Sequence, residues 1–474
     1  MTWEIVIGLE VHAQLQTQTK IFSCESTRFG QAPNAQVGEV SAGLPGVLPV
    51  LNAEVVRLAA RVGMALGCEV HPWSQFARKN YFYPDLPKGY QISQYKDPIC
   101  TGGQIEYLLD GQPKVCRLTR IHIEEDAGKS NHGGRHSLLD LNRAGVPLVE
   151  IVTEPDLRSA EEAAACFREL RDILRTVGAC DGNMEEGSLR CDANVSLRRA
   201  GGPLGTRAEV KNLNSFRFVQ KAIEYEVVRQ RDVLEAGQRV VQETRLFNAD
   251  TGRTFTMRSK EDAHDYRYFP DPDLPPLVLE ASWLEEQRAA MPELPAQRRA
   301  RYTSRWGLSL DDASLLAQSK VVGDYFDQAC AGTQAGKTVA NWVINDVLRE
   351  AGGEEGLEGL RFGPGHVGEL AELIERGDLT SKLAKTVFAA MLQDGRRPSE
   401  VAQAEGLLPI RDEGELTRLV LAIKGEFPKQ SEQLQGGKDS LMGFFVGQMM
   451  SRTGGKADPK LTRELILRHI KGET

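Results

Sequence analysis

Carboxylate and imidazole side chains occur at every second position in segments that have the period of a β-strand. Residues 1–16 form the clearest such segment, in which Glu10 and His12 alternate with apolar residues. Successive side chains of a strand point to opposite faces, so the segment predicts one apolar face and one polar face. Two later segments repeat the pattern, 189–198 and 206–211, and they present Asp192 and Glu209.

Several carboxylates near one imidazole make a hard, oxygen-rich ligand set of the kind that Mg²⁺ prefers. Without a metal ion the carboxylates would repel one another, and their pKa values would rise. Three cations lie on the same predicted faces, Arg190, Arg207 and Lys211, and such cations hold phosphate oxygens. The combination suits transfer of a phosphoryl group to a carboxylate. The alternative interpretation is that all of these are ordinary solvent-facing strand residues.

Two further acidic segments, 121–126 and 184–188, bring more carboxylates into the same part of the chain. In the first of them His122 and Glu124 share one strand face, and Glu125 lies on the other. The pattern does not decide which of the two glutamates faces the predicted site.

Aromatic rings, cations and amides alternate over residues 78–95, a stretch that includes Lys79 and Tyr81. Aromatic rings beside cations form platforms on which an unpaired base stacks. A proline-turned loop that packs with its tyrosines is an equally good interpretation.

The sequence supports neither of two common catalytic signatures. It contains no G-x-x-x-x-G-K-[ST], so a nucleotide would not be held by a P-loop. Residues 178–182 match the outline G-x-C-x-G, but a nucleophile elbow follows a strand and opens a helix. Here the match follows a predicted helix and precedes a strand, so it is interpreted as a turn, and we expect no glutaminase in this chain.

Both helices and strands are predicted to position these residues. Residues 159–178 and 215–236 have the apolar period of a helix, and Ser159 begins the first with a capping box to Glu162. Residues 243–258 form a predicted hairpin. Strands and helices do not alternate regularly, so the fold class is α+β, with a mainly antiparallel sheet.

Beyond about residue 292 nearly every segment is predicted to be helical. The expected helices are 296–304, 311–331, 338–351, 365–376, 381–393 and 398–405, followed by a short linker at 406–409 and a small helical unit. The predicted domains are 1–293, 294–405 and 406–474. The last has 11 Lys and Arg against 9 Asp and Glu, a weak basic excess in a chain of net charge −8. That excess fits a nucleic-acid contact, but a solvated helical surface is an equally good interpretation.

The composition is that of an ordinary globular protein, with 41% hydrophobic and 26% charged residues. No apolar run is long enough to span a bilayer, and the first residues lack the basic region of a signal peptide. Eight scattered cysteines form no C-x-x-C pair. We therefore expect a cytoplasmic protein without a disulfide framework.

Seven motifs in order resemble the B subunits of the aspartyl/glutamyl-tRNA(Asn/Gln) amidotransferases, the GatB family. They are Val6–His12, Tyr81–Asp85, His122–Ser130, Asp140–Arg143, Glu185–Asn194, Glu209–Phe216 and Asp265–Pro270. The resemblance continues more loosely to the tail, through Met442–Gln448.

The resemblance implies a cradle domain related to the catalytic fold of glutamine synthetase, then a helical domain and a tRNA-binding tail. It implies a ligase that uses ATP and Mg²⁺ to phosphorylate the side chain of Glu-tRNA(Gln) or Asp-tRNA(Asn) during translation. Ammonia would then displace the phosphate. The implied partners are an amidase-type glutaminase subunit and a small third subunit that wraps the pair, giving a heterotrimer.

The resemblance also assigns roles to residues. It implies metal binding by Glu10, His12 and Glu125, with Glu124, Asp192 and Glu209 as further candidate ligands. Glu10, His12, Glu125, Asp192 and Glu209 are the expected catalytic residues. Arg190 and Lys211 would offset phosphate charge, and Lys79 and Tyr81 would contact the substrate.

Two other functions stay open. The chain could be a non-catalytic scaffold that positions the acceptor end of tRNA, with the carboxylates as a folding metal site. It could also be a free-standing ligase acting on a small molecule, which the long helical region makes the less suitable interpretation.

Overall fold

The structure is a computed structural model that describes residues 3–133, 136–259, 266–407 and 410–472. The chain divides into two compact units, Met1–Gln297 and Arg298–Thr474. The first unit is mixed α and β around a large, mostly antiparallel sheet, and the second is helical, as expected. The boundaries of the three predicted domains remain predictions.

The large sheet of the first unit has 13 strands, of which ten follow one another in the order β15-β14-β13-β12-β1-β11-β8-β5-β4-β16. Every neighbouring pair in this order is antiparallel except β13 and β14. The ten strands are β1 Trp3–Gln14, β4 Phe76–Asn80, β5 Tyr90–Gln94, β8 Gln112–Glu125, β11 Pro147–Thr153, β12 Leu189–Arg199, β13 Ala208–Lys211, β14 Glu243–Asn248, β15 Arg253–Ser259 and β16 Phe269–Pro270.

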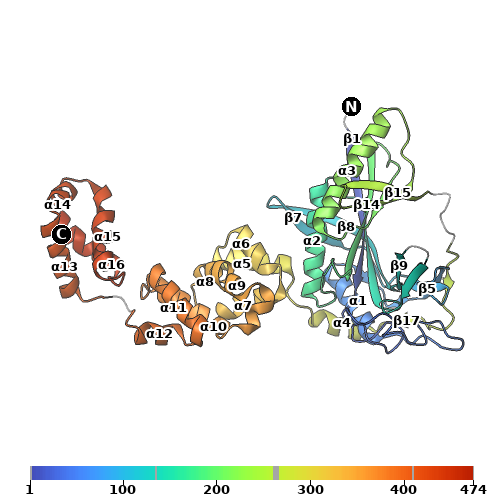
Figure 1. Cartoon of the computed structure of the whole chain (residues 1–474), viewed down its shortest axis with the longest axis horizontal. Helices are drawn as coiled ribbons and strands as arrows, with labels where there is room; N and C mark the ends of the chain where they lie inside the picture. Colours follow the sequence, from blue (N-terminus) through green and yellow to red (C-terminus); the bar gives the residue numbers. More distant parts are fainter. Residues whose placement is uncertain (1–2, 134–135, 260–265, 408–409, 473–474) are drawn as a thin grey trace. The chain divides into compact units, whose positions relative to one another are not determined.

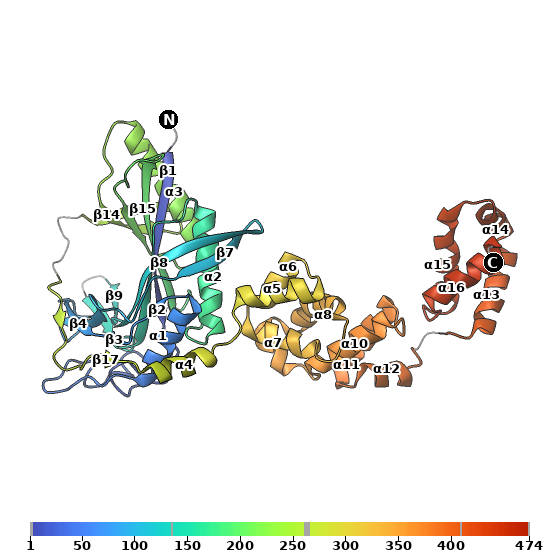
Figure 2. The same cartoon turned by 180° about the vertical axis from the view of Figure 1, so that it is seen from behind.

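Seven further strands lie outside this order. They are β2 Glu69–Val70, β3 Trp73–Ser74, β6 Cys100–Thr101, β7 Gln104–Leu109, β9 Lys129–Gly133, β10 His136–Asp140 and β17 Leu277–Val278. The β7–β8 hairpin runs beside helix α2 Ala160–Thr176 at one margin of the sheet (Figure 2).

Three helices cover the apolar face of the sheet: α1 Ala53–Ala65, α2 Ala160–Thr176 and α3 Phe216–Glu235 (Figure 1). Ile7, Leu9 and Val11 of β1 are buried in the same core as these helices. The alternation in β1 is thereby confirmed, because its apolar residues face the helices and its polar residues face away.

The two helices predicted within the first unit are also confirmed. The hydroxyls of Ser159 and Ser215 accept backbone N–H groups at the starts of α2 and α3. In a capping box the Glu162 carboxylate would accept the N–H of Ser159. It instead accepts the N–H of Arg158, one residue earlier, at 2.7 Å. A fourth helix, α4 Ala281–Ala289, ends the unit.

Strands β1 and β11 separate toward the N-terminal end of β1. They pair from Gln14↔Leu148 as far as Glu10↔Val152, and the register of β11 against β8 then shifts between Val152 and Thr153. Beyond this bulge the backbone N–H of Leu9 donates to the Thr153 hydroxyl at 2.8 Å. Regular pairing between β1 and β11 therefore ends at this bulge.

The second unit contains helices that gather around two hydrophobic clusters. The first cluster lies among α5 Pro295–Trp306, α6 Leu310–Ala317, α7 Lys320–Ala329, α8 Gly336–Trp342, η2 Val343–Val347, α9 Leu348–Ala351, η3 Glu354–Gly359, α10 Pro364–Glu375, α11 Ser381–Asp394 and α12 Pro398–Ala404. The second lies among α13 Glu413–Glu426, α14 Pro428–Gln435, η4 Asp439–Leu441, α15 Met442–Arg452, α16 Pro459–Ile466 and η5 Leu467–Lys471.

One expected helix of this unit is wrong. Residues 311–331 form two helices, α6 and α7, because the Ser319 side chain accepts the N–H of Val322 and begins a new helix. The expected linker 406–409 lies partly outside the described residues, as does Asp265 of the last motif.

All eight cysteines are free thiols, as expected for a chain without a disulfide framework. Among the helices of the described residues, none combines the length and the apolar character that crossing a bilayer requires.

Candidate active site

Strand register aligns the polar residues of the sheet in rows. Residues directly opposite each other in an antiparallel pair lie on the same face. Arg190 of β12, His12 of β1, Glu150 of β11 and His122 of β8 therefore form one row. Asp192 and Glu10 are opposite each other in the next row.

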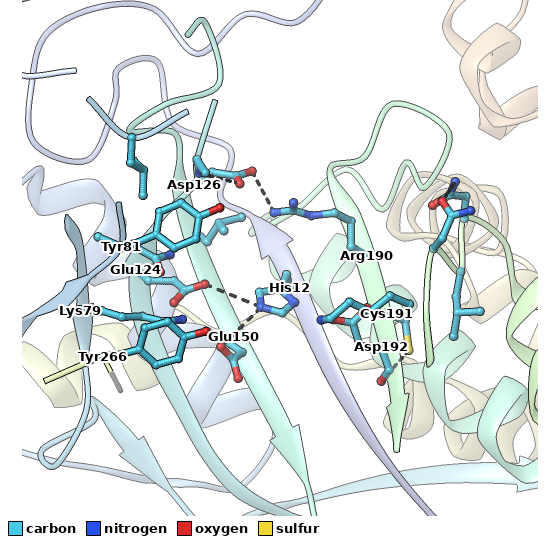
Figure 3. A pocket seen from close by; sticks show the side chains of 18 residues that line it. His12, Lys79, Tyr81, Glu124, Asp126, Glu150, Arg190, Cys191, Asp192 and Tyr266 are labelled. Carbon is cyan, nitrogen blue, oxygen red and sulfur yellow. Dashed lines mark hydrogen bonds and ion pairs between the residues drawn. The ribbon is translucent and has the colours of Figure 1, made fainter. Parts of the chain in front are cut away.

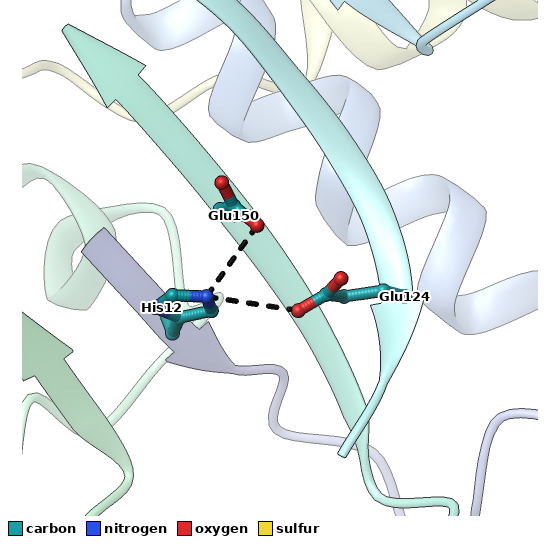
Figure 4. A group of neighbouring side chains, drawn as sticks. All are labelled: His12, Glu124 and Glu150. Carbon is teal, nitrogen blue, oxygen red and sulfur yellow. Dashed lines mark ion pairs between the residues drawn. The ribbon is translucent and has the colours of Figure 1, made fainter. Parts of the chain in front are cut away.

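His12, Glu124 and Glu150 converge at the centre of this face (Figure 4). The Nε2 atom of His12 lies 3.4 Å from Oε2 of Glu150 and 3.7 Å from Oε1 of Glu124. One ligand atom from each residue lies within 4.8 Å of the others. Among the described residues this is the group whose spacing suits a metal ion, and we call it the triad.

A second imidazole, His122, contacts both carboxylates of the triad. Its Nε2 atom lies 3.3 Å from Glu150 and 3.5 Å from Glu124. Burial alone would lower the pKa of His122, but the charges of Glu150 and Glu124 outweigh it and raise that pKa to about 9. In the absence of a metal ion, protons on the imidazoles therefore balance the buried carboxylates.

The pKa values of the triad shift in the same sense. Burial opposes the charged forms, but the contacts with Glu150 and Glu124 raise the pKa of His12. Burial would raise the pKa of each glutamate, but the imidazoles lower that of Glu124 and lower that of Glu150 far more. The carboxylates are thus ionised and could hold a metal ion, while His12 would have to lose a proton before it could bind one.

Glu10, Asp192 and Glu209 lie on the same face, toward β13. Lys211 contacts two of them, pairing with the Asp192 carboxylate and lying 2.8 Å from Oε1 of Glu209. Glu10 accepts a hydrogen bond from Asn194 at 2.8 Å. Burial, and then repulsion from Glu150 and Glu209, raises the pKa of Glu10. A cation beside Glu10 would relieve that repulsion.

Arg190 is held by a carboxylate that the sequence did not single out. Its Nη2 donates to Oδ2 of Asp126 at 2.9 Å, and Gln14 donates to the same oxygen at 2.9 Å. Burial would raise the pKa of Asp126, but Arg190 and Arg143 outweigh it and lower that pKa. The guanidinium of Arg190 is therefore fixed in direction beside His12 (Figure 3).

A cavity of about 460 Å³ opens over these residues. Lys79, Tyr81 and Tyr266 line it, and the Lys79 ammonium lies 4.8 Å from the centre of the Tyr266 ring (Figure 3). Nearby, Tyr268 stacks on Tyr95 with ring centres 4.1 Å apart. Burial, and then the charges of Glu124 and Glu150, raises the pKa of Tyr268, so its hydroxyl remains protonated. Aromatic rings therefore form part of the cavity wall, beside Glu124 (Figure 3).

Glu125 is not part of the triad. It lies opposite Pro147 on the other side of β8, where its Oε1 accepts the N–H of Ile92 at 2.8 Å and its Oε2 lies 2.6 Å from Nζ of Lys88. The two glutamates that the sequence could not separate thus have different surroundings, and Glu124 is the one that meets His12.

Of the other expected site residues, Glu10, His12, Asp192 and Glu209 share one face, and Arg190, Lys211, Lys79 and Tyr81 line the cavity above it. Sequence reasoning missed Glu150, His122, Asp126 and Tyr266 as site residues. Glu150 had one available signal, since it is a single carboxylate within the apolar run Pro147–Thr153.

Two family models and several curated relatives match the chain. Residues 5–285 match the family model described as the GatB/GatE catalytic domain, and residues 324–470 match the GatB domain. A curated relative from Geobacter sulfurreducens, named as the B subunit of aspartyl/glutamyl-tRNA(Asn/Gln) amidotransferase, is 50% identical over 481 residues, covering 100% of both chains. A protein of the same name from Thioalkalivibrio sulfidiphilus is 51% identical, covering 99% of this chain and 100% of its own.

Proposed function

The chain belongs to the GatB family of amidotransferase B subunits, and on this premise we propose that its polar sheet face activates a carboxylate on tRNA. The reaction transfers the γ-phosphoryl group of ATP to the side chain of Glu-tRNA(Gln) or Asp-tRNA(Asn). Ammonia then attacks the acyl phosphate. The observation that carries the proposal is the triad of His12, Glu124 and Glu150 beneath a cavity lined with cations and aromatic rings.

The donor set of the triad fits a divalent cation. Two ionised carboxylates and one imidazole supply ligand atoms within 4.8 Å of one another, and oxygen-rich sets of this kind suit Mg²⁺. Glu10, Asp192 and Glu209 would serve a second cation, since burial, and then repulsion from Glu150 and Glu209, raises the pKa of Glu10. A bound divalent ion would offset the charge of phosphate oxygens.

The chain's own residues have defined tasks in this scheme. Arg190, oriented by Asp126, would hold a phosphate oxygen in a fixed direction. Lys211 would do so from the opposite side after leaving Asp192 and Glu209. Lys79, Tyr81 and Tyr266 would hold the aminoacyl end of the tRNA against the carboxylates.

The chemistry requires activation because a carboxylate is a poor electrophile. A carboxylate oxygen of the substrate forms a bond to the γ-phosphorus, and the bond to the β-phosphate breaks to release ADP. Ammonia next bonds to the acyl carbon, phosphate leaves, and the nitrogen loses a proton. Positioning and charge compensation are what a protein contributes to such a transfer.

The partners follow from the same scheme. An amidase-type subunit would release ammonia from glutamine, and a small third subunit would wrap the pair into a heterotrimer. The helical unit would hold the body of the tRNA. A cytoplasmic location agrees with the eight free thiols. A cradle related to glutamine synthetase remains our expectation for the first unit.

The test is transfer of labelled γ-phosphate to misacylated tRNA by the full chain with its partner subunits. We expect Glu150→Ala to abolish transfer and to leave tRNA affinity unchanged. Glu154→Ala is the matched control, because Glu154 directly follows the same strand but accepts a hydrogen bond from Thr119 at 2.7 Å. Transfer that survives in Glu150→Ala would favour the non-catalytic scaffold instead.

A further inference from the structure

The chain leaves β13 at Asn212 in a backbone conformation that few residue types adopt. Asn212 has a φ of +68°, in the left-handed region, and within the described residues only three other non-glycine residues have a positive φ, Asn34, Asp110 and Arg267. The left-handed conformation is unfavourable for most side chains, and asparagine is among those that tolerate it best. Unusual backbone conformations of this kind cluster at functional sites, and Asn212 lines the 460 Å³ cavity above the triad.

The turn at Asn212 determines which side chains after β13 reach the polar face. Val210 is buried in the core, and Lys211 lies on the polar face, where it contacts Asp192. If the strand continued, residue 212 would face the core and residue 213 would face the cavity. Instead Leu213 is buried in the core and Asn212 is exposed. The left-handed residue therefore makes Lys211 the last side chain of β13 on the polar face.

The side chain of Asn212 anchors this turn to the neighbouring strand. β13 and β14 pair as far as Lys211↔Leu246, and Asn212 and Phe247 would form the next pair. In place of a backbone pair, the Nδ2 of Asn212 donates to the backbone oxygen of Phe247 at 2.9 Å. Phe247 is fully buried, so its backbone is a fixed point. The end of β13 is thus held directly after Lys211.

Lys211 depends on this anchor because its backbone has few other supports. The register of β13 against β12 ends at Val210, so at Lys211 the pairing is with β14. A lysine side chain is long and flexible. The direction in which the backbone carries it therefore decides which groups the ammonium can reach. In the structure those groups are Asp192 and Glu209, at the wall of the cavity.

From these observations we infer that Asn212 is a positioning residue for Lys211. Its left-handed turn holds the lysine where the ammonium can leave the two carboxylates and bind a phosphate oxygen of ATP. The inference rests on the proposed function. The amide of Asn212 is turned toward β14, so the residue acts through Lys211 and does not contact the nucleotide. A side chain that resists a positive φ would relax toward the extended conformation and carry Lys211 away from the phosphate.

The experiment measures the affinity for ATP, with Mg²⁺, of the full chain assembled with its partner subunits. Asn212→Ala should weaken ATP about tenfold, because alanine disfavours the left-handed conformation. Asn212→Gly should weaken it only about twofold, because glycine keeps the turn and loses the hydrogen bond alone. Urea unfolding should become easier in both variants, since glycine also loosens the unfolded chain. The affinity for ATP therefore separates positioning from a merely structural role.

Asn34→Ala is the matched control. Asn34 also has a left-handed φ, of +60°, and its Nδ2 donates to the backbone oxygen of Leu139 at 2.9 Å, but it does not line the cavity. Its replacement should leave the affinity for ATP unchanged. Lys211→Met tests the route of the effect. In that background Asn212→Ala should change the affinity by less than about twofold, because residues that act as one unit are not additive.

Four results would overturn the inference alone, given that Lys211→Met weakens ATP. They are an unchanged affinity in Asn212→Ala, an equal loss in Asn34→Ala, a loss in Asn212→Gly as large as that in Asn212→Ala, and a full loss from Asn212→Ala in the Lys211→Met background. The third result would mean that the asparagine side chain itself contacts the nucleotide. If Lys211→Met leaves the affinity for ATP unchanged, the phosphate-binding role of Lys211 in the proposed function is wrong together with the inference.

Discussion

Replacing Glu150 with Gln should lower the pKa of His122. The pKa of His122 is raised to about 9, against about 6.5 for a free imidazole. That difference corresponds to about 3 kcal/mol. Glu150 is the nearer carboxylate, at 3.3 Å, and Glu124 remains at 3.5 Å. We expect Glu150→Gln to lower the pKa of His122 by about 1.5 units, within the range of 1–3 that one nearby charge produces.

The sign of the linked stability follows from the raised pKa. The stabilisation from this proton is complete below about pH 6.5 and is lost as the pH rises through about 9. In the unaltered, metal-free protein, unfolding of the first unit should therefore become easier between these values. In Glu150→Gln this dependence should be flatter, and stability at pH 6 should be lower.

The assay is an NMR titration of the metal-free full chain, in which the eight histidines are isotopically labelled. Glu154→Gln is the control. It removes a carboxylate that follows the same strand but accepts a hydrogen bond from Thr119, so the pKa of His122 should not change. If the pKa of His122 moves by less than half a unit in Glu150→Gln, or equally in the control, the electrostatic account of the triad is wrong.

Three other results are expected. Affinity for Mg²⁺, measured by calorimetry, should increase between pH 6 and 9, because His12 must lose a proton to bind; an affinity that falls with pH would refute this. Asp126→Asn should raise the KM for ATP severalfold with little change in tRNA affinity, because Arg190 loses its charged partner; an unchanged KM would exclude the positioning role. Ser159→Ala should destabilise α2 by about 1 kcal/mol in urea unfolding, and no change would mean that this cap contributes nothing.

The faces of β1, β12 and β13 could be predicted from the sequence because one side of each strand is covered by helices and the other is not. A strand with one buried face alternates strictly between apolar and polar residues, and this alternation places Glu10, His12 and Asp192 on the open face. Segment 121–126 was ambiguous because both faces of that part of β8 are buried, so polarity no longer distinguishes them. Only the pairing of β8 with β11 decides that Glu124 faces His12.

Contacts between distant segments were beyond the sequence for a related reason. Glu150 joins the site because the register of β11 places it opposite His12, and Asp126 joins it because it pairs with Arg190, 64 residues away. No local sequence pattern encodes either partner. The break at Ser319 is different, because a serine that can cap a helix was visible there. The apolar period continues across Ser319, and this is why the pattern predicts one helix there.

The placement of Gly8, Glu10 and His12 on alternate residues of β1 makes this strand sensitive to insertions but not to extensions. A single residue inserted between Trp3 and Gly8, with the start of the strand held in place, would turn every later side chain through half a revolution. Glu10 and His12 would then enter the helix-covered core, and Leu9 and Val11 would face the nucleotide. Residues added before Trp3 would not change which face each later side chain takes. The register of this one strand, more than its composition, therefore determines which residues reach the polar face.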